Sequence, residues 1–230
     1  MSTNEQGRNR FVLWGGVAAV LVIAVVVAVV VSSGSDDHAG TTTQFETAKV
    51  TTTATPLPRY DSASYAHNGK DPAIGMTLPT LHGHSVFDGK PITIGPNGKP
   101  QMLVFVAHWC PHCQAEVPRL VTLDHLGTFK GVHVTAVATG TNDAAPNYPP
   151  SAWLKRVGWP FPVMADSPSG AAANAYGLNA YPFFVLVYAN GKIAGRGTGE
   201  VTTDQVKANV KALLAGTPLP LLSPGSSSTA

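Results

Sequence analysis

Residues 103–120 read LVFVAHWCPHCQAEVPRL and contain the only two cysteines of the chain, Cys110 and Cys113. The apolar run from Met102 to Ala107 has the length of a strand that is buried on both faces. A helix is expected from Pro111 to Leu126, because proline suits a first helical turn and apolar side chains recur along one face. The cysteine pair is therefore predicted to lie where a buried strand passes into a helix.

Two cysteines at this spacing permit three interpretations. A structural disulfide is the weakest, since closing so small a loop constrains the unfolded chain very little. The pair can instead exchange a disulfide with another protein, or supply half of a tetrahedral metal site. At a helix N-terminus the free N–H groups and the helix dipole would stabilise Cys110 as a thiolate, whereas Cys113 would be more buried and keep its proton. For exchange, we predict that Cys110 attacks and that Cys113 resolves the mixed disulfide.

The rest of this region alternates between strands and helices. The segment 83–99 is expected to form a hairpin-like start, because Asp88-Gly89 and Asn97-Gly98 are turn dipeptides. Further strands are expected at 132–138, 163–165, 183–188 and 192–196, and further helices at 151–157, 169–176 and 203–214, the last capped by Thr202 or Thr203. This order predicts an α/β fold in which a central mixed sheet is flanked by helices on both faces.

An unbroken apolar run extends from Phe11 to Val31. It is long enough to cross a hydrocarbon core of ~30 Å as a helix. Arg8 and Arg10 precede the run and acidic residues follow it, so the positive-inside rule places residues 1–10 in the cytoplasm and the following chain outside. We predict a retained single-pass anchor at residues 11–31 in a bacterial cell membrane. A cleaved signal peptide is the alternative, although its apolar region is usually only about 7–15 residues long.

The remaining boundaries follow from changes in composition. Residues 32–59 are rich in Ser and Thr and predict a flexible stalk, residues 60–216 predict the folded domain, and residues 217–230 predict a disordered tail. Only 12% of the residues are charged and the net charge is +2. Because no basic block occurs, a nucleic-acid partner is not expected.

Three blocks of sequence carry a resemblance to a known family: VFVAHWCPHCQAEVPRL, WPFPVMAD and AYGLNAYPFFVLVYANGKIAGRGTG. The region from about Ala73 to Ala215 resembles the thioredoxin superfamily, in particular the membrane-anchored TlpA/ResA/DsbE-like thiol–disulfide oxidoreductases of bacteria. The second and third blocks lie far from the cysteines, which makes the match more specific than a Cys-X-X-Cys pair alone. The resemblance implies a thioredoxin-like fold and a redox-active cysteine pair.

The resemblance also assigns the surroundings of the cysteines. Pro182 matches the cis-proline that faces the active site in this family, and Tyr181 and Pro182 would border the groove that holds a substrate chain. Trp109 matches the aromatic residue that covers the disulfide on one side. Together with Pro111, these residues form the predicted substrate-binding set.

His112 and Glu116 complete the predicted catalytic set. Cys-Pro-His-Cys resembles the active site of the strong oxidant DsbA, in which a histidine between the cysteines stabilises the thiolate and makes the disulfide more oxidising. Thioredoxins carry a buried acid six residues before the first cysteine, where this chain has Val104. Glu116 aligns with an acid of the ResA-like branch and is the candidate acceptor for the proton of Cys113. Tyr181 stands where reductase branches often have Thr.

The metal alternative would need more ligands than the two thiols. His108 and His112 are the nearest candidates for zinc or Cu(I), but they come from a strand end and from between the cysteines, which is awkward geometry. Sco-type copper chaperones share the fold and space their cysteines by three residues instead of two. We therefore expect no metal and no cofactor.

Together these features predict an extracytoplasmic enzyme that exchanges disulfides with protein thiol substrates and is recycled by a membrane redox partner. Oxidation of substrates is slightly favoured over reduction. The alternatives are a reductant in cytochrome c maturation, or a Cu(I)-binding or haem-assembly module with the same fold.

Overall fold

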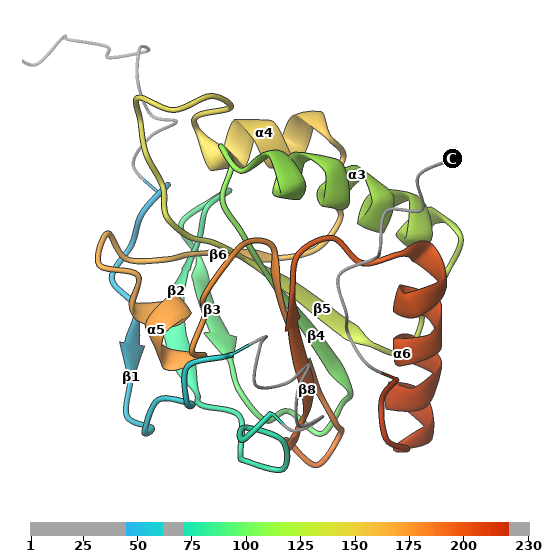
Figure 1. Cartoon of the computed structure of the whole chain (residues 1–230). Helices are drawn as coiled ribbons and strands as arrows, with labels where there is room; N and C mark the ends of the chain where they lie inside the picture. Colours follow the sequence, from blue (N-terminus) through green and yellow to red (C-terminus); the bar gives the residue numbers. More distant parts are fainter. Residues whose placement is uncertain (1–44, 62–70, 221–230) are drawn as a thin grey trace, which may run out of the picture. The chain divides into compact units, whose positions relative to one another are not determined.

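The computed structural model describes residues 45–61 and 71–220. One mixed sheet forms its centre, with the strand order β1-β2-β6-β5-β4-β7-β8, and β3 pairs with β2 (Figure 1). The strands are β1 Thr51–Thr52, β2 Leu81–Ser85, β3 Pro91–Ile94, β4 Gln101–Val106, β5 His133–Ala138, β6 Val163–Ala165, β7 Phe183–Val187 and β8 Ile193–Thr198. The helices are α3 Pro111–His125, α4 Pro150–Arg156, α5 Ala171–Ala175 and α6 Thr203–Ala215.

Strand β4 lies at the centre of the sheet, and its sequence explains why. All six of its residues are buried. It pairs in parallel with β5 and antiparallel with β7. A strand that is covered on both faces must be apolar throughout, as the sequence predicted. Its C-terminal end leads directly to the cysteines, so the active-site candidates are attached to a strand that is buried at every residue.

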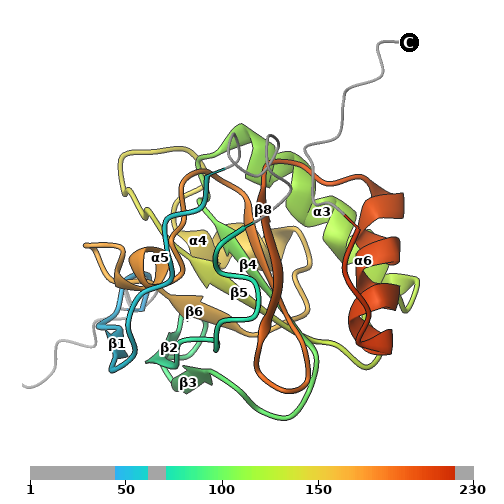
Figure 2. The same cartoon turned by 60° about the horizontal axis from the view of Figure 1, so that its bottom comes forward.

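The two faces of the sheet are covered by different elements. Apolar side chains of α3, α4 and α6 pack together against one face, which includes Val104 and Phe184. Short α5 and the segments around Leu57 and Leu78 pack against the other face, which includes Phe105 and Val185. Figure 2 shows α3 and α6 on the opposite side from α5. The predicted α/β architecture with helices on both faces is confirmed.

Most element boundaries agree with the sequence prediction to within two residues. Helix α6 begins after Thr202, whose hydroxyl accepts a hydrogen bond from the N–H of Gln205 while the Gln205 side chain accepts one from the N–H of Thr202. This capping box satisfies two N–H groups that the first helical turn leaves free. The predicted turn at Asp88-Gly89 connects β2 to β3.

The prediction of a flexible stalk is wrong for residues 45–59. Strand β1 pairs with β2, and Val50 and Leu57 are buried in the core. The Ser/Thr-rich composition predicted a stalk because composition reflects only the local preference of a segment for order or disorder. Val50 and Leu57 instead pack against a surface that distant segments of the chain form. The first residue of the predicted tail also contacts the folded domain. The Thr217 carbonyl accepts a hydrogen bond of 2.8 Å from the Tyr188 hydroxyl.

The predicted cytoplasmic segment 1–10 and anchor 11–31 lie outside the described residues, as do residues 32–44 of the stalk and residues 221–230 of the tail. Among the helices of residues 45–61 and 71–220, none has the length and apolar character required to cross a membrane.

Candidate active site

The cysteine pair lies at the strand–helix junction that the sequence predicted. Cys110 is the N-cap residue of α3, with Pro111 in the first turn, and Cys113 lies one turn further along the helix. Cys110 is 7% exposed and Cys113 is fully buried. Both are free thiols. An attacking group on the substrate therefore meets Cys110 before Cys113.

Burial changes the acidity of the Cys113 thiol. It raises the pKa of the Cys113 thiol well above its usual range, because an apolar environment disfavours the thiolate. The negative charge of Glu116 on the same helix face acts in the same direction. Cys113 therefore needs a proton acceptor before it can attack. The candidate acceptor is the carboxyl of Glu116, three residues further along α3.

Tyr181 and Pro182 form the wall opposite Cys110. The peptide bond between them is cis, as the resemblance implied. The Tyr181 carbonyl oxygen lies 3.9 Å from the Cys110 sulfur, in weak hydrogen-bonding contact. Pro182 is buried, and its carbonyl accepts a hydrogen bond of 2.9 Å from the N–H of Gly199, which ties this wall to the end of β8. The structure thus brings the predicted wall residues together with the predicted attacking thiol.

Trp109 extends the wall on the outer side. The residue is 37% exposed, and its ring meets the ring of Tyr181 edge to face. The indole N–H donates a 2.7 Å hydrogen bond to the carbonyl of Gly140, in the loop that follows β5. A Cβ at residue 140 would lie 2.9 Å from the Tyr181 hydroxyl, and the φ of +60° also favours glycine. Gly140 is a site residue that the sequence analysis did not identify, although a TGTN stretch after a strand is typical of a turn.

Pro111 has a different role from the other predicted substrate-binding residues. It is exposed at the first helical position of α3, where its missing N–H leaves no hydrogen bond unmade. Its position beside Cys110 agrees with the prediction, but the structure shows for it no hydrogen bond to the opposite wall.

His108 is held away from the cysteines. Its Nδ1 donates a 2.7 Å hydrogen bond to the carbonyl of Pro146, and its Nε2 accepts one of 3.2 Å from the N–H of Asn142. Both ring nitrogens are therefore used by the loop before α4, and neither is available to a metal ion. Within the described part of the chain, no three His, Cys, Asp or Glu side chains converge as a metal site would require.

His112, between the two cysteines, contacts an acidic residue that the sequence analysis did not identify. Its Nδ1 lies 2.9 Å from a carboxylate oxygen of Glu200, in the connection between β8 and α6. This contact lowers the pKa of Glu200. The other carboxylate oxygen of Glu200 accepts a 3.1 Å hydrogen bond from Arg119 on α3. The partners were not predictable because residues 112 and 200 are 88 positions apart.

Glu116 is completely buried on the side of α3 that faces the β8–α6 connection. One of its oxygens accepts hydrogen bonds from Arg119 and, at 3.3 Å, from the N–H of Val201. The other oxygen has no hydrogen-bond partner. Burial raises the pKa of Glu116 from 4.5 to about 7, even though the guanidinium of Arg119 opposes the shift. A carboxyl that titrates near neutral pH can both accept and return a proton, as predicted for this residue.

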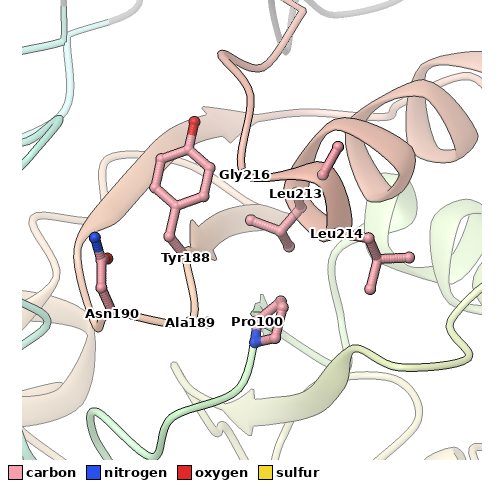
Figure 3. A pocket seen from close by; sticks show the side chains of 8 residues that line it. Pro100, Tyr188, Ala189, Asn190, Leu213, Leu214 and Gly216 are labelled. Carbon is pink, nitrogen blue, oxygen red and sulfur yellow. The ribbon is translucent and has the colours of Figure 1, made fainter.

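A separate hollow lies at the far end of α6 (Figure 3). Its lining comprises Pro100, Tyr188, Ala189, Asn190, Leu213, Leu214, Ala215 and Gly216. None of the predicted site residues is among them, so this hollow is not part of the active site.

Comparison with known proteins agrees with this geometry. A family model described as Redoxin matches residues 73–214. The thiol–disulfide oxidoreductase ResA of Geobacillus thermodenitrificans is 29% identical over 116 residues, which cover 50% of this chain and 64% of that protein, slightly under two thirds of its length. ResA of Bacillus thuringiensis subsp. konkukian is 30% identical over 126 residues, which cover 54% of this chain and 69% of that protein.

A solved structure gives the same result at the level of the fold. The thiol:disulfide interchange protein of the thioredoxin family from Chlorobium tepidum TLS superimposes with a TM-score of 0.51 at 27% identity. The match covers 63% of this chain and 99% of that one. The predicted class, a thioredoxin-like protein related to ResA and DsbE, is therefore confirmed. The cysteine pair lies at a strand–helix junction and the Redoxin model covers more than half of the sequence, so the chain belongs to the Redoxin family, alongside the ResA-like thiol–disulfide oxidoreductases.

Proposed function

We propose that the chain exchanges disulfides with protein substrates through Cys110 and Cys113. The placement of the two thiols carries this proposal: Cys110 lies at the N-terminus of α3, is 7% exposed and contacts the Tyr181 carbonyl, while Cys113 is completely buried one turn further along the helix. In the reducing direction, the Cys110 thiolate attacks one sulfur of a substrate disulfide and displaces the other as a thiolate. Cys113 then attacks the Cys110 sulfur and releases the second substrate thiol, so that the chain is oxidised by two electrons. Oxidation of a substrate dithiol is the reverse.

Glu116 takes part in the second step. The Cys113 thiol must lose its proton to attack, and the Glu116 carboxyl, three residues along the helix, is the group positioned to accept it. Since burial raises its pKa to about 7, the carboxyl is partly ionised at neutral pH and able to act in both directions. In the oxidising direction the protonated carboxyl returns the proton to Cys113 as that sulfur leaves.

The first test uses the two cysteine variants. Cys110→Ser should abolish exchange, because it removes the accessible nucleophile. Cys113→Ser should retain the first step and accumulate mixed disulfides, which can be trapped from cells, separated without reductant and identified by mass spectrometry. Mixed disulfides formed by Cys110→Ser and not by Cys113→Ser would contradict the assigned order.

For the direction, we favour oxidation of substrates. The support is the Cys-Pro-His-Cys sequence and the oxidising compartment expected from the apolar run at residues 11–31. A redox titration of the full chain against glutathione decides this. A potential close to the thioredoxin value of about −270 mV would exclude a strong oxidant, whereas one near −120 mV would support it.

Reduction is the second candidate, and one observation favours it. A leaving thiol with a raised pKa departs slowly, and Cys113 is the leaving group when the chain oxidises a substrate. In cytochrome c maturation such a reductant would need an electron donor in the membrane. The third candidate, a Cu(I)-binding or haem-assembly module, gains no support from the geometry, because both nitrogens of His108 are already used. Stoichiometric, tight copper in the reduced full chain would nevertheless establish it.

The proposed location is outside the cytoplasm, with residues 1–10 inside and residues 11–31 retained as the anchor. The support is the charge asymmetry around the apolar run. A protease added to spheroplasts should digest the domain and leave a membrane-bound N-terminal fragment. A domain released into the medium with a new N-terminus near Ser32 would instead establish a cleaved signal peptide.

A further inference from the structure

A line of polar and ionisable side chains connects the exposed surface of the cysteine loop with the buried carboxyl. It starts at His112, whose side chain is 67% exposed, and passes through Glu200 and Arg119, which are 36% and 32% exposed. It ends at Glu116, whose side chain is completely buried. These groups come from α3 and from the β8–α6 connection, so the fold brings them together across the active-site end of the helix.

We propose that Arg119 and Glu200 are positioning residues that act on Glu116 with opposite sign, Arg119 favouring the ionised carboxyl and Glu200 favouring the protonated one. Both roles deepen the proposed function, because they set how readily Glu116 accepts the proton of Cys113.

The contribution of Arg119 follows from its contacts. The groups that face the Glu116 carboxyl among the described residues are Cys113 and Arg119 on α3, together with Glu200 and the N–H of Val201. Arg119 is the one cation of this set. Its Nη1 contacts the carboxyl and also donates a 3.1 Å hydrogen bond to the Val201 carbonyl, which fixes the guanidinium in place. Since a guanidinium keeps its charge at any relevant pH, Arg119 stabilises the carboxylate permanently.

The contribution of Glu200 is the reverse. Its charge is repulsive toward a second carboxylate, and it raises the pKa of Glu116. It also binds Nη2 of Arg119, so it shares the cation on which the Glu116 carboxylate depends. The imidazole of His112 contacts the other oxygen of the Glu200 carboxylate at 2.9 Å.

The two carboxyl oxygens of Glu116 differ in their hydrogen bonding, which also bears on where the proton is held. One carboxyl oxygen takes both hydrogen bonds, from Arg119 and from Val201, and the other oxygen is buried without a partner. An orphaned oxygen in an apolar interior is unfavourable for a carboxylate and suits a carboxyl that carries a proton there. The line of side chains thus ends at an atom on which a proton can be held and from which it can be removed.

The decisive experiment titrates Glu116 directly. The full chain, labelled with ¹³C at its glutamate carboxyl carbons, is followed by NMR from pH 4 to pH 9, and Glu116 is assigned by its absence in Glu116→Gln. Arg119→Gln should move the midpoint up by about one unit, and the resolving step at pH 7 should then slow about fivefold, because the ionised fraction falls from about one half to about one tenth. Glu200→Gln should move the midpoint down by about half a unit, a smaller effect because Glu200 is partly exposed to solvent.

Opposite shifts distinguish this proposal from a purely structural role, in which both variants would perturb the site alike. Lys207→Gln and Asp124→Asn make the same charge changes at other positions on α6 and α3 and should leave the midpoint unchanged. The downward shift caused by Glu200→Gln should be smaller when Arg119 is already replaced by Gln, since part of it acts through the guanidinium.

Shifts in one direction, shifts as large in the controls, or strict additivity would overturn the proposal. The NMR readout does not require turnover. A wild-type chain that fails to exchange disulfides would therefore remove the proposed function, while the midpoints would still report on the roles of Arg119 and Glu200.

Discussion

The rings of Trp109 and Tyr181 meet edge to face, with centroids 5.8 Å apart and planes at 87°. Each residue is also held from another side, Trp109 by the Gly140 carbonyl and Tyr181 through its backbone contact with Cys110. The pair therefore forms a continuous aromatic wall beside the attacking thiol. We expect a substrate chain that presents its sulfur to Cys110 to pass along this wall.

We expect Tyr181→Ala to raise KM for a peptide disulfide by about 2- to 10-fold with little change in kcat. An edge-to-face pair contributes about 0.5–1.5 kcal/mol, and its loss frees the Trp109 ring, which we expect to contact the substrate. Steady-state kinetics with one peptide disulfide measures both constants. Tyr181→Phe keeps the ring and should stay within about twofold of wild type. A fall in kcat at constant KM would show that the ring acts in the chemical step instead.

The pKa of Glu116 predicts how stability depends on pH. Burial raises this pKa from 4.5 to about 7, so the folded state holds the proton more tightly than the unfolded state does. The resulting stabilisation is fully present below about pH 4.5 and is lost as the pH rises through 7. It amounts to roughly 3 kcal/mol.

Urea unfolding of wild type and Glu116→Gln at pH 4.5 and pH 8 checks this prediction. Carboxyl groups that do not interact with Glu116 titrate equally in both proteins, so the difference between their pH dependences reports on Glu116 together with its neighbour Glu200. Wild type should lose more free energy of unfolding than the variant between the two pH values. Equal losses would mean that Glu116 has an ordinary pKa in the folded chain.

Asp71 and Arg196 form a completely buried ion pair, with hydrogen bonds of 2.6 and 2.8 Å. Arg196 also donates to the carbonyls of Pro58 and Tyr176, at 2.8 and 2.7 Å. Arg196→Met should lower the free energy of unfolding by about 3–5 kcal/mol, because it leaves the Asp71 charge buried without a partner. Denaturant unfolding measures the loss.

Two further variants test the origin of that loss. Asp71→Asn in the Arg196→Met background should recover part of it, because the uncompensated charge is then removed. Lys192→Met replaces an exposed cation of the same hairpin and should change stability by no more than about 0.5 kcal/mol. If the double variant were no more stable than Arg196→Met, the loss would come from packing and not from the buried charge.

The segment 45–59 should be required for a stable domain. Residues 60–220, expressed without it, should lose at least about 3 kcal/mol relative to residues 45–220, since burying one Val or Leu side chain contributes about 1.5–3 kcal/mol. The relevant side chains are Val50 and Leu57, which are 8% and 3% exposed. Thermal unfolding of the two fragments compares them. Equal unfolding temperatures would mean that residues 45–59 do not stabilise the domain and act as the stalk that composition predicted.

Much of the fold was predictable because it is determined locally. The apolar run of β4, the proline at the start of α3 and the capping residue Thr202 each act through neighbours within a few positions. The positions of the two cysteines and Glu116 on α3 were predictable for the same reason, since one helical turn separates Cys113 from each of the other two. The family resemblance added Tyr181 and Pro182, which no local pattern would have placed opposite Cys110.

The unpredicted parts depend on contacts between distant residues. Glu200 and Gly140 reach the site only through the paths of the β8–α6 connection and the loop after β5. Glu46 gives no sign in its Thr-rich surroundings that it is buried, yet its carboxylate accepts hydrogen bonds from the N–H and the hydroxyl of Ser151 at the start of α4. Such partners are chosen by the tertiary structure and leave no periodic pattern in the sequence.

The attachment of Glu46 has a mechanical consequence. Its carboxylate holds Ser151, and its backbone carbonyl accepts a 3.4 Å hydrogen bond from the Thr141 hydroxyl, next to the glycine that fixes Trp109. Any tension applied to the chain ahead of Phe45 would thus enter the domain beside the active-site wall and not at the opposite edge of the sheet. A pulling force would act on the loop that carries Gly140 and Thr141 before it acted on the core, so a tethered form of this domain would be loaded beside the proposed substrate site.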